Sequence, residues 1–444
     1  MRGMKPYSTP LGHVKPILDY RSVLWATGII AAILLSVMLI YTSRSTVLAF
    51  TPDTGAWEIA TNLVNGRGYT GCRGDYFPFC NSANQTTAMR EPVPVLLMAL
   101  TMLITHFKYA DLILQSLFYL GTMLVIYTIL KNDDRRAALL AAFLWVVSIP
   151  VIKELNNDSS ELVAAFFFSL GLLFFLKGYK EQKTRDWVAS GIFMGLASLS
   201  RSVLLGVSGG LVIALLFTGL RDISRSWKER FAPALLFLIA IGLILAPWII
   251  RNDIVFGVPV IGSTLAGYNI FRMNFIIANN TFFPHYVGPS DAYQAVMNLI
   301  QKSNLTGREN ETQMQSFYLK AGLQIIAQHP FRYISLSLYR FLVLWFNTSV
   351  KTAYDLRLNL KDYIATIQQS VFLIAVVIGS AKNQKKYWPL ILSLVLGCGA
   401  YMAVSAQLRY LVDLMPAVVI LSALAISGSQ FLIKRKSSTP VLRG

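Results

Sequence analysis

Acidic and basic side chains recur where apolar segments of this sequence end, and they are the residues best suited to chemistry. Asp53 directly follows the first apolar segment, and Arg90 and Glu91 directly precede the second. Comparable positions hold further charges: Glu154, Asp158, Glu161, Arg201, Arg251 and Arg409. A carboxylate can accept a proton, and an arginine can hold a phosphate through paired hydrogen bonds. The pattern therefore indicates a polar site that handles a phosphorylated substrate.

The composition is typical of a polytopic helical membrane protein. Of the 444 residues, 55% are hydrophobic and only 14% are charged. The repeated apolar runs approach the roughly 20 residues that a bilayer core requires. They favour one membrane domain over the two or three soluble domains that the length alone would allow. We therefore expect an all-α bundle of about ten transmembrane helices, with extracytoplasmic re-entrant or interfacial helices beside it.

The net charge is +18, and Lys and Arg cluster in short loops beside these runs. The clearest examples are KNDDRR at 131–136, GYKEQKTRD at 178–186 and LRDISRSWKER at 220–230. An excess of Lys and Arg marks cytoplasmic loops. Such loops explain the charge without a nucleic-acid partner, so we predict none.

The basic loops assign sides to the remaining segments. The expected divisions are a cytoplasmic segment at 1–21, a membrane domain at 22–433 and a cytoplasmic tail at 434–444. The apolar run 22–41 is predicted to be an uncleaved signal anchor, which leaves the loop 42–91 outside. Only one crossing then fits before the first basic loop, and 110–130 supplies it. Residues 92–107 are therefore expected to be interfacial or re-entrant.

The same counting places the candidate charges on one side of the membrane. The expected outer segments are 42–91, 153–161 and 251–364, and the expected last spans are 365–381, 388–405 and 411–433. Residues 187–219 begin and end inside, so they cross twice, with Arg201 near the outer turn. Residues 333–350 are expected to be interfacial, because 365–381 alone reaches the basic KNQKK at 382–386. The scattered acids and arginines are thus predicted to converge outside.

Two of the three cysteines, Cys72 and Cys80, share the outer loop and are close enough in sequence to pair in an oxidising compartment. Cys398 stands in an apolar run and is expected to be a core residue. No Cys/His set has the spacing of a zinc site.

A sugar carried on a polyprenyl phosphate suits such a site well. Its anionic leaving group is anchored in lipid, where arginines can bind it. A carboxylate beside the anomeric carbon can take the proton of an incoming hydroxyl. The plainer alternative is a set of solvated charges and structural ion pairs, which explains any single member of the set about as well.

The ordered motifs resemble GT-C glycosyltransferases, most closely the bacterial branch related to protein O-mannosyltransferases and the lipid A aminoarabinose transferase. The first two are TPDTGAWEIATNLVNGRGYTG, which contains Asp53, and REPVPVLLMAL, which begins at Arg90. Later matches are Ser160–Glu161, GLASLSR ending at Arg201, APWIIRNDIVFGVPVIGSTLAGYN from Ala246, His329–Pro330 and RYLVDLMP from Arg409 to Pro416. The family often has two prolines where this chain has Glu91–Pro92.

The resemblance implies a GT-C-like bundle and gives roles to residues. Asp53 matches the general base, and Glu161 matches a second outer-loop acid. The residues assigned to the donor phosphate are Arg90, Arg201, Arg251, Arg409 and Tyr410, and further candidates are Glu91, Asp158 and Asn252. The implied reaction is a single inverting transfer of a hexose or pentose.

The implied partners are a polyprenyl-phosphate-linked sugar, the lipid bilayer and an acceptor that is a lipid, a glycan or a protein. The resemblance implies no definite cofactor, and a divalent metal is compatible with the acids. We expect a bacterial inner-membrane protein with an extracytoplasmic active site. The alternatives are a transporter or flippase of lipid-linked sugars, a polysaccharide polymerase or ligase that uses a pyrophosphate-linked donor, and a structural scaffold.

Overall fold

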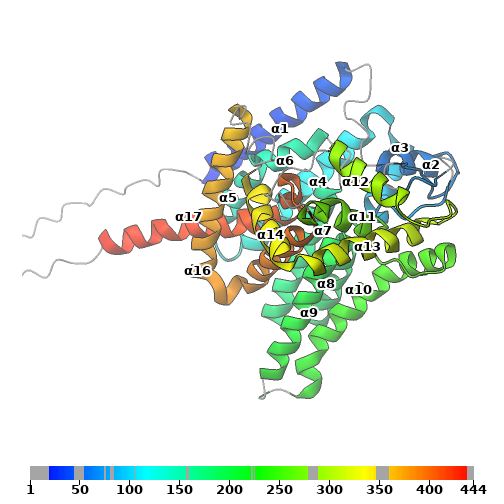
Figure 1. Ribbon diagram of the computed structural model, residues 1–444. Coiled ribbons are helices and arrows are strands. Elements are labelled where there is room, and N and C mark those ends of the chain that lie inside the picture. The colour runs from blue at the N-terminus through cyan, green and yellow to red at the C-terminus, as the bar shows by residue number, and fades with distance from the viewer. Residues whose placement is uncertain are drawn as a thin grey trace, which may run out of the picture.

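The computed structural model describes residues 20–44, 55–74, 77–80, 85–105, 107–156, 160–221, 224, 226–278, 289–346 and 360–437, which are mainly helical (Figure 1). The elements are α1 (Tyr20–Arg44), α2 (Ala56–Val64), α3 (Pro92–Ile104), α4 (Phe107–Leu130), α5 (Arg135–Val146), α6 (Ile149–Lys153), η1 (Glu154–Asn156), α7 (Glu161–Glu181), α8 (Thr184–Ser198), α9 (Val203–Arg221), α10 (Trp227–Phe256), α11 (Ala266–Asn274), η2 (Phe275–Ala278), α12 (Pro289–Gln301), α13 (Glu311–Gln328), α14 (Pro330–Phe346), α16 (Leu360–Val404), η3 (Leu408–Leu414) and α17 (Met415–Ser437). Within the described residues strand pairing is limited to an isolated bridge between Thr70 and Thr86.

The helices confirm the expected all-α membrane protein. Seven described segments are long and apolar enough to cross a bilayer: Ser22–Ile40, Tyr109–Leu130, Glu161–Glu181, Val203–Arg221, Trp227–Phe256, Tyr363–Val404 and Leu408–Gly428. The sixth, at 42 residues, has the length of two spans, since one span takes roughly 20 residues. The remaining predicted crossings correspond to α5 and α8, which have 12 and 15 residues.

The predicted loop at 382–386 is helical in the structure. It lies inside α16, which covers both predicted spans, 365–381 and 388–405, and has one non-helical residue, Tyr387. Lysine and glutamine are good helix formers, so this sequence continues the helix. Pro389 then accounts for the kink, because a proline disturbs the turn that precedes it.

The main core lies among α4, α5, α7, α8, α10, α16 and α17. Helix α17 is apolar around its whole circumference, and the side chains from Met415 to Leu421 that pack this core are fully buried. A Cβ atom at Gly379 of α16 would collide with the Leu421 carbonyl oxygen. The two helices therefore pack backbone to backbone at this point, which only glycine permits.

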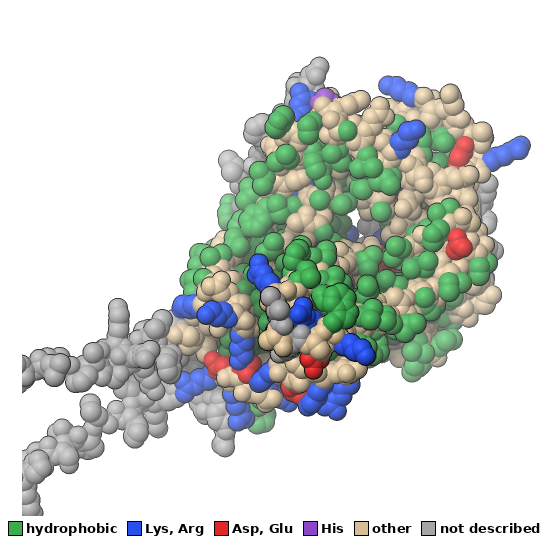
Figure 2. All heavy atoms as spheres, turned by 90° about the horizontal axis from the view of Figure 1, so that it is seen from below, with side chains coloured by type: hydrophobic (Ala, Val, Ile, Leu, Met, Phe, Trp, Pro, Cys, Tyr) green, Lys and Arg blue, Asp and Glu red, His purple; other side chains and the backbone are tan. Residues whose placement is uncertain are grey.

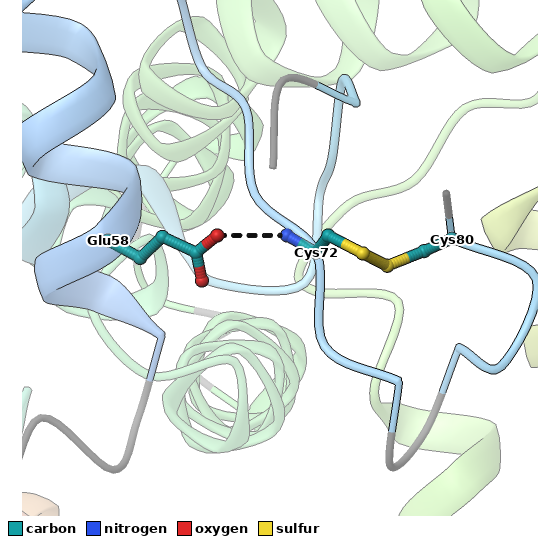
Figure 3. The surroundings of a disulfide bond; sticks show 3 residues. All are labelled: Glu58, Cys72 and Cys80. Atoms are coloured by element: carbon teal, nitrogen blue, oxygen red, sulfur yellow. Dashed lines mark hydrogen bonds between the residues drawn. A yellow bond between two sulfur atoms is a disulfide. The ribbon is translucent and has the colours of Figure 1, made fainter. Parts of the chain in front are cut away.

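A second core joins α2 and α3 to α11, α12 and α13. Its edge carries a disulfide between Cys72 and Cys80, whose Cα atoms are 5.7 Å apart, which confirms the predicted pairing. Figure 3 shows the Glu58 carboxylate of α2 accepting a hydrogen bond from the Cys72 amide, at 3.3 Å. Cys398 is free and buried, as predicted. The disulfide and this contact hold the loop after α2 against the helix that precedes it.

Three of the predicted basic segments meet at Asp133, between α4 and α5. Its carboxylate lies 2.9 Å from Nζ of Lys386 and 3.8 Å from Nζ of Lys180, and it accepts a hydrogen bond from the Tyr387 hydroxyl at 3.0 Å. Partial burial disfavours the charged carboxylate, but the Lys386 and Tyr387 contacts outweigh it and lower the pKa of Asp133. Figure 2 shows Lys and Arg side chains gathered at one end of the face it presents.

Candidate active site

One pocket collects most of the described residues that the sequence singled out. Its cavity volume is about 40 Å³, and it lies where α2, α3, α4, α7 and η3 come together. Its lining residues are Ala56, Arg90, Glu91, Pro94, Val95, Met98, Leu114, Ser160, Glu161, Arg201 and Arg409. Charges from four distant parts of the chain therefore face one cavity.

Glu161 is the central acid of this pocket. It is the first residue of α7, where the positive end of the helix dipole stabilises a carboxylate. Its Oε1 accepts a hydrogen bond from Nη1 of Arg201 at 2.8 Å and lies 3.8 Å from Nε of Arg409. Glu161 is 2% exposed, so one buried carboxylate holds the two arginines together.

Arg201 lies at the turn between α8 and α9 and has a second carboxylate partner. Its Nε is 3.4 Å from Oδ2 of Asp413, and its Nη2 is 3.2 Å from the Tyr401 hydroxyl oxygen. The guanidinium also lies over the rings of Tyr401 and Tyr410, 5.8 and 4.8 Å from their centroids. Burial opposes the charge of Arg201, but Glu161, Tyr401 and Asp413 outweigh it and raise its pKa.

The segment that ends in Arg90 and Glu91 is attached to the same turn. Glu91 precedes Pro92, the first residue of α3, and its Oε1 accepts hydrogen bonds from the Ser202 amide and hydroxyl, at 3.2 and 2.7 Å. The Tyr69 hydroxyl donates to the Arg90 carbonyl at 2.9 Å. These bonds hold the start of α3 next to Arg201.

The opposite wall of the pocket is apolar. Pro94, Val95 and Met98 supply it from α3, and Leu114 supplies it from α4. The other face of α3 exposes large apolar side chains: Leu96, Leu100, Leu103 and Ile104. With 13 residues, α3 is about 20 Å long, too short for a bilayer core of about 30 Å. The pocket lining thus contains both charged and apolar residues, and the helix that supplies most of the apolar ones also exposes apolar side chains.

This architecture has counterparts among known proteins. Residues 89–250 match the sequence profile of the family described as dolichyl-phosphate-mannose-protein mannosyltransferase. The archaeal oligosaccharyltransferase AglB from Archaeoglobus fulgidus, in complex with an inhibitory peptide and a dolichol-phosphate, is 15% identical and gives a TM-score of 0.55 over 96% of this chain and 52% of that chain. The apo form of the Archaeoglobus fulgidus oligosaccharyltransferase gives 0.57 at 14% identity, over 94% and 51%.

The protein has the GT-C fold. ArnT from Cupriavidus metallidurans bound to undecaprenyl phosphate also matches, at 14% identity over 94% of this chain and 81% of that chain, with a TM-score of 0.41. A search of curated protein sequences finds no match. The GT-C chain described here spans about half the length of the two oligosaccharyltransferase structures.

Two predicted site residues of this GT-C chain lie away from the pocket lining. Arg251, near the end of α10, donates to the Thr87 carbonyl at 2.9 Å and to the Tyr69 carbonyl at 3.3 Å. Asn252 is fully buried and bonds the Val260 carbonyl and Nη1 of Arg251. The donors of Arg251 are thus used by protein oxygens, so the structure gives it the position of a brace for the loop before α3.

The remaining predictions concern Asp53, Asp158, Tyr410 and a metal. Asp53 and Asp158 lie outside the described residues. Tyr410 is half-buried and stacks on Tyr401 beside the pocket, with ring centroids 5.2 Å apart. Within the described part of the chain, no group of three or more His, Cys, Asp or Glu side chains could hold a metal ion.

Three buried residues beside the pocket were not predicted from the sequence. Asp413 and Tyr401 bind Arg201, and Glu311 of α13 accepts a hydrogen bond from the Ala88 amide at 3.3 Å and another from the Thr264 hydroxyl. Asp413 stands inside the RYLVDLMP motif, so an acid within an apolar segment was an available signal. Tyr401 has no comparable signal in the sequence, since its neighbours from Gly397 to Val404 carry no charge.

Proposed function

We propose that the protein transfers a sugar from a polyprenyl-phosphate donor to an acceptor hydroxyl on the extracytoplasmic face of a bacterial inner membrane. The convergence of Arg90, Arg201 and Arg409 with Glu161 beside an apolar wall is the observation that carries this proposal. A lipid-linked phosphate has an anionic head and an apolar chain, and the pocket offers both surfaces at once. The mannosyltransferase family match over residues 89–250 and the GT-C fold support the same class of reaction.

In the proposed reaction Asp53 is the general base. It takes the proton of the acceptor hydroxyl as that oxygen attacks the anomeric carbon. The bond from the anomeric carbon to the phosphate oxygen breaks, and the lipid phosphate leaves with the bonding pair, facing arginine. Attack opposite the leaving group inverts the anomeric centre. Asp53 precedes the pocket residue Ala56 by three positions. Three residues of extended chain span at most about 11 Å.

The proposed sidedness has two supports. The Cys72–Cys80 disulfide lies in the same outer loop as Arg90, and structural disulfides persist in oxidising compartments. The basic segments that meet at Asp133 are typical of a cytoplasmic surface. Both agree with a pocket that opens on the extracytoplasmic side.

The central test is Asp53→Asn in purified, reconstituted protein. With a radiolabelled polyprenyl-phosphate sugar, we expect the wild type to transfer label to an acceptor and the variant to lose at least about a thousandfold in rate, since it retains binding but no base. Asp291→Asn, an exposed acid of α12, is the matched control and should keep full activity. An Asp53→Asn enzyme with wild-type turnover and normal membrane insertion would contradict the assignment.

The same preparation separates the rival functions. A flippase would move labelled lipid between leaflets of proteoliposomes without forming a new glycoside. A polymerase or ligase would use a pyrophosphate-linked donor and ignore the monophosphate. Comparison of the glycolipids and glycoproteins of a deletion strain with those of its parent would then identify the acceptor class.

A further inference from the structure

We propose that Arg409 contacts the donor phosphate, while Arg201 is a positioning residue held by two further residues, Asp413 and Tyr401. This division of labour rests on the proposed function, because it concerns the same phosphate. It separates two arginines that the sequence treats alike. The argument depends on what each guanidinium already binds.

Each of the three nitrogens of Arg201 already contacts a protein group. Its Nη1 donates to Glu161 at 2.8 Å, its Nη2 donates to Tyr401 at 3.2 Å, and its Nε lies 3.4 Å from Asp413. Its side chain is 17% exposed. Two carboxylates also neutralise its charge at close range, so Arg201 offers an incoming phosphate little net attraction.

Arg409 differs in each of these respects. Its side chain is 41% exposed, and its only ion pair among the described residues is with Glu161, at 3.8 Å. Its Nε has no hydrogen-bond partner in the described structure. Arg409 also lines the pocket, close to the apolar wall where a lipid chain would lie. The Arg409 guanidinium is therefore more accessible to a phosphate ligand than that of Arg201.

Asp413 and Tyr401 anchor Arg201 from behind. Both side chains are buried, and the Tyr401 hydroxyl donates a hydrogen bond to Oδ2 of Asp413 while it accepts one from Arg201. Tyr401 belongs to α16, and Asp413 belongs to η3. The anchor thus ties two segments to the turn between α8 and α9, and no part of it reaches the pocket lining.

These contacts form a chain that runs from Asp413 and Tyr401 through Arg201 to Glu161, and from Glu161 to Arg409. Arg409 contacts the phosphate before and during its departure, so its loss should weaken ground-state binding as well as turnover. A small displacement of Glu161 and Arg409 affects the developing charge more than it affects the bound donor. Loss of the anchor should therefore lower turnover with little effect on donor affinity.

The experiment measures undecaprenyl phosphate affinity and sugar transfer on the same detergent-purified full-length protein. We expect Arg409→Gln to raise the Kd for undecaprenyl phosphate at least about tenfold. Asp413→Asn and Tyr401→Phe should each leave that Kd within about threefold and lower kcat at least about tenfold. Because both act through Arg201, the double variant should lose no more than the worse single variant.

Matched controls and a folding check accompany these variants. Arg308→Gln and Asp291→Asn change exposed residues outside the pocket lining and should behave as wild type in both assays. Size-exclusion profile and Tm show whether each variant is folded. Should Asp413→Asn fail to fold, Tyr401→Phe, which removes one hydroxyl group, carries the test alone.

Several results would overturn the inference. One is an Asp413→Asn or Tyr401→Phe protein whose Kd rises as much as that of Arg409→Gln. Another is an Arg409→Gln protein that binds undecaprenyl phosphate like wild type. If wild-type protein binds the lipid phosphate but transfers no sugar, the proposed function fails, and the binding comparison still decides the assignment of Arg409. If wild-type protein does not bind the lipid phosphate, both proposals fall.

Discussion

The guanidinium of Arg340 is buried in α14 with no carboxylate in contact among the described residues. Its Nη1 donates to the carbonyls of Met402 and Ala403, both at 3.2 Å. Its Nη2 donates to the Met273 carbonyl at 2.7 Å and to Oδ1 of Asn274 at 3.1 Å. Burial lowers the pKa of Arg340 to about 10, so the side chain is still charged at neutral pH. The Arg340 guanidinium thus joins α14 to α11 and to the end of α16. Its acceptors in α16 are the two residues that directly follow Tyr401.

We expect Arg340→Met to lower the free energy of unfolding by roughly 3 kcal/mol, because buried acceptors left without a donor cost about 1–3 kcal/mol each. Arg340→Lys should recover little of this loss, since an ammonium cannot serve four acceptors in the planar geometry of a guanidinium. Denaturant or thermal unfolding in detergent measures both. Arg308→Met, at an exposed arginine, is the control. A stability equal to wild type for Arg340→Met would contradict the interpretation.

At the residue scale, the sequence predicted the site best where a charge interrupts an apolar segment. Arg90, Glu91, Glu161, Arg201 and Arg409 were found in this way, because the energetic penalty of such charges implies a shared polar site. That rule does not specify which neighbour a charge meets. Arg251 obeys it equally well, yet its guanidinium binds backbone oxygens of the preceding outer loop. Partner choice depends on helix packing, which periodicity does not encode.

At the scale of elements, α13 is connected to the loop before α3 through its first residue, Glu311. Its carboxylate is 6% exposed and accepts hydrogen bonds from the Ala88 amide, at 3.3 Å, and from the Thr264 hydroxyl. Burial raises the pKa of Glu311, and the hydrogen bonds and the nearby Arg251 only partly offset it. The loop that carries Arg90 is therefore joined to the second core through an acid that is easier to protonate than usual.

This shift has a definite sign. A raised folded-state pKa means that the folded protein binds the proton more tightly than the unfolded chain does. The stabilisation is complete below the ordinary value of 4.5 and is lost as pH rises through the raised value. Glu311→Gln removes the titration, so we expect its Tm relative to wild type to increase from pH 4.5 upward. Thermal scans at a series of pH values test this, with Glu309→Gln as the neighbouring control. A Tm difference that is independent of pH would contradict the interpretation.

The sequence predicted some helices and turns correctly and missed others. The count of membrane crossings correctly required a turn near Arg201, which lies between α8 and α9. It did not anticipate that α16 continues through the basic residues 382–386, because charge marks a side of the membrane and does not break a helix. The large outer segment 251–364 was predicted without its internal helices. Its helices α11 to α14 depend on the second core, which forms from parts of the chain that are far apart in sequence.

At the scale of the whole molecule, α7 connects two differently charged ends. Glu161 begins the helix at the pocket, and Lys180 lies near its other end beside Asp133. Their separation of 19 positions corresponds to about 28 Å of helix, close to the thickness of a bilayer core, about 30 Å. The pocket and the basic cluster therefore lie one membrane thickness apart along a single rigid element. This spacing agrees with the sides of the membrane that the count of crossings predicts for the two ends.

Sidedness can be measured with single cysteines, because the natural background is low. Cys72 and Cys80 are bonded to each other, and Cys398 is buried. Lys183 is an exposed residue of the basic end, and Arg308 is an exposed residue of the predicted outer segment 251–364. Among the described residues, Lys183 forms an ion pair with exposed Glu181 alone, and such surface pairs contribute little to stability. Both positions should therefore accept a cysteine without harm to the fold.

In intact cells, a membrane-impermeant maleimide should label Arg308→Cys and leave Lys183→Cys unlabelled. After permeabilisation both should react, which shows that the second thiol was present and only shielded by the membrane. The unsubstituted protein is the blank. Labelling of Lys183→Cys from outside, or of both cysteines from the same side, would place the pocket and the basic cluster on the same face of the bilayer. The acids and arginines of the pocket would then lack an extracytoplasmic setting, and the transferase proposal would lose its physical basis.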